Sequence, residues 1–209
     1  GTTAWRFAAN LELRQGLDVL GASPDCLTNP ATCLGGTSVP PSLITGNPTA
    51  TVLRFTGQAE LRLSTQLTLA VQPRAQWASG SVFGFERFAL GNFTVGRGYD
   101  PGSLTGDDGA AVTAELRHDA IVLDDDLRLA AMPYAFVDAG WAWARGLGAG
   151  FANPQSLVSG GAGARFSIGN RARLDLSGAV ALKDAGPVQA GDVRLLVTLT
   201  SRLFPWRTR

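Results

Sequence analysis

The chain has 209 residues, 45% of them hydrophobic, and a formal net charge of +1 because 18 basic residues face 17 acidic ones. This composition excludes a disordered chain and a disulfide scaffold, and the balanced charge gives no indication of a nucleic-acid partner. No apolar run approaches the roughly twenty residues of a transmembrane helix, so a helical membrane span is excluded too. Lys183 is the only lysine, so nearly all the basic residues are arginines.

Apolar and polar residues alternate with a period of two along most of the chain. Such alternation is typical of strands that have one apolar and one polar face. Eight strands are predicted, at residues 5–13, 53–63, 67–77, 112–117, 127–141, 158–168, 173–183 and 193–203. Most of them exceed the five or six residues usual in soluble sheets, and they suit the roughly 9–11 residues that a tilted membrane strand needs.

Short and long connections alternate between the predicted strands. The short ones lie around Ser64, residues 124–126 and residues 169–170, and the long ones include residues 16–49 and 79–110. Short periplasmic turns and long external loops are typical of outer-membrane β-barrels. The apolar face would then contact outer-membrane lipid, and the many arginines of the polar face would line a wet lumen. A soluble barrel with its apolar face inward is the alternative, because alternation alone does not choose a direction.

The most unusual segment is the long connection 79–110. Its centre reads Val95-Gly96-Arg97-Gly98-Tyr99 and continues through Gly102 to Gly106-Asp107. A second motif, Phe-x-Asp-x-Gly, stands at Phe136, Asp138 and Gly140, and a glycine-rich segment that ends at Arg165 follows it. These motifs, in this order, resemble the loop-6 and wall motifs of the Omp85 superfamily. They are most similar to those of the two-partner secretion transporters, the haemolysin secretion/activation (TpsB) family.

The resemblance implies an all-β fold, an antiparallel transmembrane β-barrel of sixteen strands preceded by two POTRA domains. Loop 6 joins the eleventh and twelfth strands of that barrel. Residues 1–209 would therefore form the C-terminal eight strands, with residues 79–110 as loop 6 inserted in the lumen. Because this loop follows only the third predicted strand, and position 1 already lies inside an alternating pattern, we expect the POTRA domains and the first half of the barrel to be missing from this sequence.

The resemblance also implies a function in the bacterial outer membrane. A protein of this family would conduct a secreted partner exoprotein (TpsA-like), such as a haemolysin or adhesin, through its pore and activate it. It would be inserted by the barrel-assembly machinery, would not be an enzyme and would need no cofactor. Two alternatives stay open: an Omp85-type assembly and insertion factor, and a passive porin-like channel. The tract from Gly102 to Asp107 favours the secretion branch.

Within this family the loop-6 arginine meets the wall aspartate, which implies a contact between Arg97 and Asp138. The residues themselves support the same pairing, because Asp138 lies on the polar face and a carboxylate in a narrow pore needs a partner. A planar guanidinium can bind it in a bidentate manner. We expect Phe136 and Tyr99 to pack against the loop tip, and Gly96, Gly98 and Gly102 to permit its tight turn.

Other candidate sites are weaker. Cys26 and Cys33 predict a disulfide in an external loop, because a zinc site would need two more soft ligands that are absent. Residues 124–126 and 107–109 are interpreted as turns rather than as cation sites. His118, the only histidine, is interpreted as an interfacial residue, and no metal site is predicted.

Overall fold

The structure is a computed structural model that describes residues 4–22, 25–26, 33, 42–91, 95–145, 153–169 and 171–201. Among these residues no helix is long and apolar enough to cross a membrane. The elements are β1 (Trp5–Gln15), β2 (Thr51–Arg62), β3 (Leu67–Ala78), the 3-10 helix η1 (Gly84–Glu86), β4 (Phe88–Leu90), β5 (Leu104–Gly106), β6 (Asp108–His118), β7 (Ile121–Asp124), β8 (Leu129–Trp143), β9 (Gln155–Ile168), β10 (Ala172–Ala181) and β11 (Val193–Ser201).

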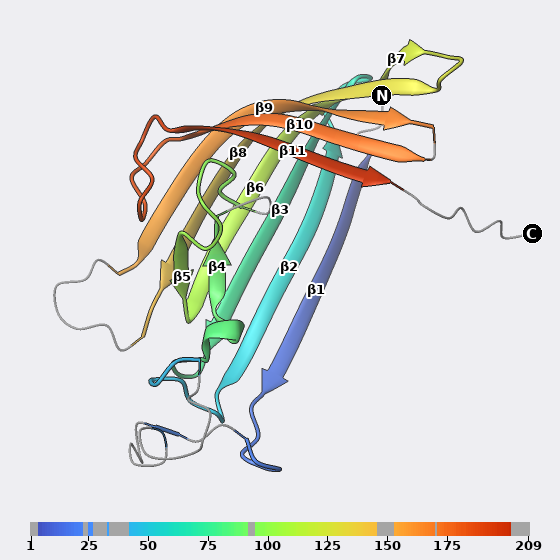
Figure 1. Cartoon of the computed structure of the whole chain (residues 1–209). Coiled ribbons are helices and arrows are strands. Elements are labelled where there is room, and N and C mark those ends of the chain that lie inside the picture. Colours follow the sequence, from blue (N-terminus) through green and yellow to red (C-terminus); the bar gives the residue numbers. More distant parts are fainter. Residues whose placement is uncertain are drawn as a thin grey trace, which may run out of the picture.

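The long strands form one curled antiparallel sheet in the order β1-β2-β3-β6-β8-β9-β10-β11, as Figure 1 shows. Each long strand therefore pairs with the next long strand along the chain, which is the meander of an up-and-down barrel. The prediction of an all-β antiparallel sheet of eight long strands is confirmed. The sheet is not closed, because β1 and β11 are its two edges.

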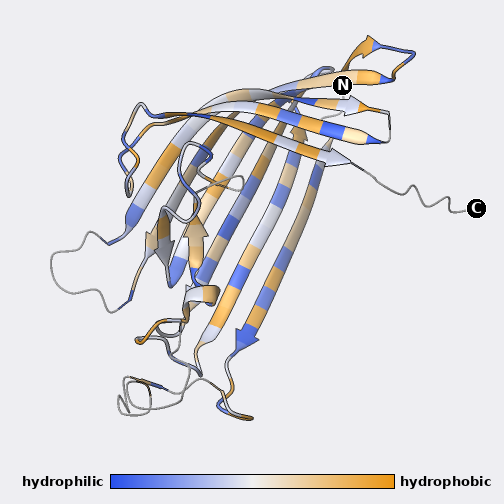
Figure 2. Cartoon of the chain, in the orientation of Figure 1, coloured by the Kyte–Doolittle hydropathy of each residue, from blue (hydrophilic) through white to orange (hydrophobic). Residues whose placement is uncertain are grey.

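The two faces of the sheet differ in chemistry, and alternating hydropathy runs along the strands in Figure 2. In β8, Tyr134, Phe136 and Asp138 are buried on the inner face, whereas Ala135 and Val137 are exposed on the outer face. Large apolar side chains on the outer face are exposed in every part of the sheet: Trp5, Phe7, Leu11 and Leu13 in β1, Leu116 in β6, Trp141 in β8, and Leu195, Val197 and Leu199 in β11. The apolar face thus points away from the concave side, as in a membrane barrel.

Two details differ from the predicted elements. The interpretation of residues 107–109 as a turn is wrong, because β6 begins at Asp108 and pairs that residue with Trp143. Loop 6 consequently spans 79–107 rather than 79–110. The second difference is β7, a strand that was not predicted. It pairs with the start of β8, and it ends at Asp124, which was expected to lie in a turn.

Loop 6 folds back over the inner face of the sheet. Its short strands β4 and β5 pair with each other and pack against β6, β8 and β9. Apolar residues of the loop form a buried cluster with residues of the sheet and of the β10–β11 connection: Phe88, Leu90, Val95, Tyr99, Leu104, Ala111, Ala142, Leu157, Ala181, Ala185 and Val188. Gly140 makes room for this packing, because a Cβ there would lie 2.7 Å from a methyl carbon of Leu90. Burial of this cluster holds the loop inside the concave face.

Candidate functional site

Two glycines shape the tip of loop 6. Gly96 has a φ of +87°, a conformation that glycine adopts without steric cost. Gly98 packs directly on β10, because a Cβ at this position would lie 2.8 Å from the backbone nitrogen of Ala181. The tight tip places the guanidinium of Arg97 against the inner wall of the sheet, where Arg97 is only 6% exposed.

Arg97 and Asp138 are in contact. The Nε and Nη2 groups of Arg97 donate to Oδ2 and Oδ1 of Asp138 at 3.0 and 2.9 Å, which is the bidentate geometry of a guanidinium on a carboxylate. The backbone N–H groups of Gly96 and Arg97 donate to Oδ2 at 3.2 and 3.0 Å, and the Ser159 hydroxyl lies 3.4 Å from it. Asp138 has no exposed surface. A buried carboxylate on β8 thus binds both the side chain and the backbone of the loop tip.

Glu115 is a second buried carboxylate of this site, and sequence reasoning did not single it out. It is 4% exposed and accepts a hydrogen bond from Nη1 of Arg97 at 2.8 Å. Arg165 also donates to both of its oxygens, at 2.9 and 3.0 Å, and Nε of Arg117 donates to Oε2 at 2.8 Å. In the sequence, Glu115 could be recognised only as a residue on the polar face of the strand that pairs with the strand of Asp138. Alternation gives that face but not the register that places Glu115 beside Phe136.

The ion-pair network extends along the inner wall. Arg117 reaches Glu60 on β2 at 3.0 Å, and Arg165 reaches Asp175 on β10 at 2.9 Å. Arg165, which was expected on the loop-6 anchor wall, contacts Glu115, the carboxylate that also binds Arg97 of the loop. Arginine can bridge two carboxylates because its guanidinium carries five donors in a fixed plane. Arg97 and Glu115 connect loop 6 to this chain of charges on the wall.

Aromatic rings support two of these arginines, whereas Tyr99 has a different role. Cζ of Arg97 lies 3.4 Å from the ring centroid of Phe136, and Cζ of Arg165 lies 4.1 Å from that of Tyr134. Such cation–π contacts stabilise a guanidinium out of water. Tyr99 is fully buried, and its hydroxyl lies 2.7 Å from the carbonyl oxygen of Val158 and 2.6 Å from that of Lys183. Tyr99 thus fastens the loop to β9 and to the segment that follows β10.

Asp107 holds the base of loop 6. Its Oδ1 accepts from the backbone N–H of Val82 at 2.7 Å, and its Oδ2 accepts from that of Arg145 at 2.6 Å. Gly106 lies against the backbone of Trp143, where a Cβ would approach Trp143 within 2.7 Å. At the other end of the Gly102–Asp107 tract the packing is open. Gly102 has a φ of +69°, and a Cβ at this position would have no neighbour within 4 Å. Asp107 is therefore a structural anchor that joins the start and the end of the loop.

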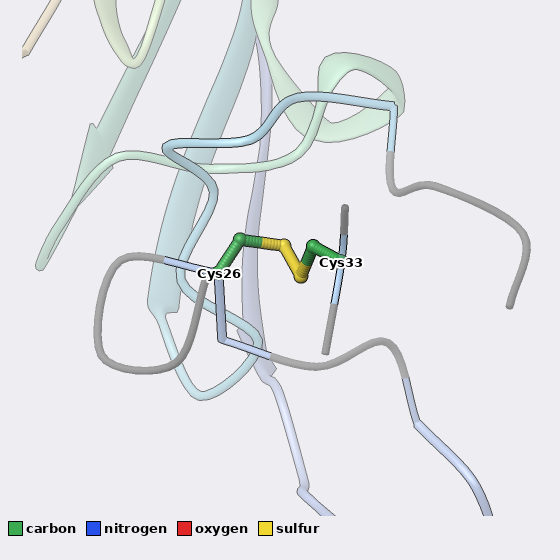
Figure 3. The surroundings of a disulfide bond; sticks show 2 residues. All are labelled: Cys26 and Cys33. Atoms are coloured by element: carbon green, nitrogen blue, oxygen red, sulfur yellow. A yellow bond between two sulfur atoms is a disulfide. The ribbon is translucent and has the colours of Figure 1, made fainter. Parts of the chain in front are cut away.

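Cys26 and Cys33 form a disulfide with their Cα atoms 5.7 Å apart, shown in Figure 3. It lies in the long connection between β1 and β2, far along the chain from the loop-6 contacts. Within the described parts of the chain, no group of histidine, cysteine, aspartate and glutamate side chains has the arrangement of a metal site.

Comparison with known proteins assigns the family. The family model described as haemolysin secretion/activation protein ShlB/FhaC/HecB matches residues 2–166. None of the curated proteins compared with the chain matches it. Two solved structures share the fold: CdiB from Escherichia coli (TM-score 0.70, 15% identity, 94% of this chain covered) and CdiB from Acinetobacter baumannii (TM-score 0.52, 22% identity, 73% covered).

The chain spans only 34% and 31% of the length of these two CdiB chains. The family model, in contrast, covers more than half of the present chain, including the whole of loop 6 and the motif around Asp138. Proteins of this family are β-barrels of the bacterial outer membrane and are not enzymes. The outward apolar face and the polar inner face of the sheet are consistent with that location. The chain belongs to the haemolysin secretion/activation family ShlB/FhaC/HecB.

Proposed function

We propose that this chain forms part of an outer-membrane pore that secretes and activates a partner exoprotein by two-partner (type Vb) secretion. The observation that carries the proposal is the buried Arg97, which joins loop 6 to Asp138 and Glu115 on the inner wall. A passive channel predicts no special loop motif, whereas here the motif arginine makes the attachment. A protein-conducting pore needs a loop that is held in a defined place inside the lumen, so that the polypeptide path has a defined width.

We propose further that the chain contributes the C-terminal eight strands of a sixteen-stranded barrel. The open edges of β1 and β11 support this proposal, because exposed sheet edges within a membrane leave backbone groups without hydrogen-bond partners. An eight-stranded barrel has an interior that its own side chains fill, so it has no room for loop 6. Additional strands would satisfy both edges and widen the lumen.

The proposed partners follow from the two faces of the sheet. The outward apolar residues, such as Leu195 and Leu199, would contact lipid hydrocarbon, and the barrel-assembly machinery would insert the strands. The secreted partner would pass along the inner face. This face carries a cavity of about 840 Å³ whose lining includes Arg97, Arg117, Arg165 and Arg173.

The test is export of the partner by the full-length natural protein that carries Arg97→Ala. Removal of one member of a buried ion pair costs about 3–5 kcal/mol, because the other charge stays behind without compensation. We expect the secreted partner in the medium to fall at least tenfold, while the transporter keeps the heat-modifiable gel migration of a folded barrel. Arg171→Ala is the matched control, because Arg171 is exposed in the turn between β9 and β10.

Export that stays at the wild-type level in Arg97→Ala would refute the proposed role of the loop-6 attachment. A general loss of other outer-membrane proteins, without a specific loss of the partner, would favour the assembly factor instead.

A further inference from the structure

A second group of arginines on the inner face lines a different cavity from the one that Arg97 lines. It consists of Arg54 on β2, Arg74 on β3 and Arg87, which directly follows η1. All three line one cavity of about 270 Å³ between the wall and loop 6, together with Phe88 and Gln76. Arg54 is paired with Gln76 across the strands, so Arg54 and Arg74 are diagonal neighbours, about 7–8 Å apart.

Of these three arginines, only Arg54 has an acidic partner among the described residues. Its Nη2 lies 2.7 Å from Oε2 of Glu86, and the same carboxylate also accepts from Nη1 of Arg14, at 2.9 Å from Oε1. Glu86 is therefore shared by two arginines already. The other polar residues of the cavity wall, Thr56 and Gln76, bring no negative charge, and Gln76 donates to the backbone carbonyls of Glu86 and Asp107.

Arg74 and Arg87 have no ion pair within the described residues. Cζ of Arg74 lies 5.5 Å from the ring centroid of Phe88. Arg87 donates from Nη2 to the carbonyl oxygen of Thr105 at 3.2 Å, but its Nε is buried without a hydrogen-bond partner. Across the described parts of the chain, this Nε is the one buried side-chain nitrogen or oxygen left without a partner. Both residues are half-buried.

An unpaired guanidinium that is partly removed from water is costly, and a buried donor without a partner adds to that cost. An anion placed in the cavity beside the two guanidiniums would supply the counter-charge that they lack. We propose that this cavity is a binding site for one oxyanion group, a carboxylate or a phosphate, held by Arg74 and Arg87. The cavity is smaller than the roughly 300–1,000 Å³ of sites for drug-sized ligands, so it suits a single anionic group.

This proposal does not depend on the secretion function, because it concerns binding alone. The experiment uses the full-length natural protein purified in detergent, titrated calorimetrically with acetate and, separately, with inorganic phosphate at constant ionic strength. We expect saturable binding of one anion per chain, and a loss of affinity of at least tenfold in Arg74→Gln and in Arg87→Gln. Arg171→Gln, the exposed control, keeps the wild-type affinity. Tighter binding of acetate assigns a carboxylate, and tighter binding of phosphate assigns a phosphate group.

A second variant guards against loss of the fold. Arg74→Glu supplies a carboxylate to Arg87 from the chain itself, so it should bind neither anion and should melt at least as high as the anion-saturated wild type. The absence of saturable binding in the wild-type protein overturns the proposal. Unchanged affinity in both glutamine variants overturns it as well.

Discussion

Replacing Glu115 by alanine tests how the wall holds loop 6. Glu115 and Arg97 have side chains only 5% and 7% exposed, and the atoms they pair are 2.8 Å apart. Breaking a buried ion pair costs about 3–5 kcal/mol. Arg97 keeps its contact with Asp138, and Arg117 and Arg165 keep Glu60 and Asp175. Because these partners remain, we expect Glu115→Ala to destabilise the attachment of loop 6 by the low end of this range, about 3 kcal/mol.

The assay is amide hydrogen exchange of the full-length barrel, read on peptides that cover residues 95–107. If local opening of loop 6 limits exchange, a decrease of about 3 kcal/mol in the free energy of that opening makes these amides exchange roughly 150-fold faster. Peptides from β2 and β3 should not change. Glu60→Ala is the matched control, since it removes a carboxylate of the same network that pairs with Arg117 on β6 and not with Arg97 of the loop. Wild-type exchange rates in Glu115→Ala would refute the idea that this carboxylate holds the loop.

Two further expectations concern the loop tip and the disulfide. Gly98→Ala places a Cβ 2.8 Å from the nitrogen of Ala181 and should destabilise the closed loop by about 1–3 kcal/mol, seen as faster exchange of residues 95–107. Gly80→Ala, whose nearest neighbour would be 3.5 Å away, should leave that exchange unchanged, and equal rates in the two variants would contradict the reasoning. Reduction of Cys26–Cys33 should speed proteolysis between β1 and β2, as mapped by mass spectrometry, while the barrel keeps its heat-modifiable migration. An unchanged cleavage pattern would show that the disulfide does not restrain this segment.

Much of the sheet could be predicted because alternation is a local property. Each of the residues Tyr134, Phe136 and Asp138 lies two positions from the next, so a strand must place all three on one face. The same rule put Arg117 and Arg165 on the polar face. Loop 6 was recognisable from its motif, and the contact of Arg97 with Asp138 could be proposed because that motif and the wall motif occur together.

The details of the site depend on register and on close approach, which no local pattern contains. Glu115 was one polar residue among many until the β6–β8 register placed it beside Phe136 and within reach of Arg97. Asp107 was interpreted as a turn residue, yet it accepts hydrogen bonds from Val82 and Arg145, residues 25 and 38 positions away along the chain. Tyr99 likewise binds carbonyl groups that only folding brings together.

The sequence by itself determined the strands, their two faces and the excess of arginine, because side-chain alternation and composition require no knowledge of neighbours. Only the tertiary structure decided which arginines form ion pairs with carboxylates. Arg97, Arg117 and Arg165 share the buried carboxylate of Glu115, whereas Arg74 and Arg87 lie in a cavity where the described residues offer them no carboxylate. The physical reason is that ion pairing acts over a few ångströms between strands, and their relative register is set by the whole sheet.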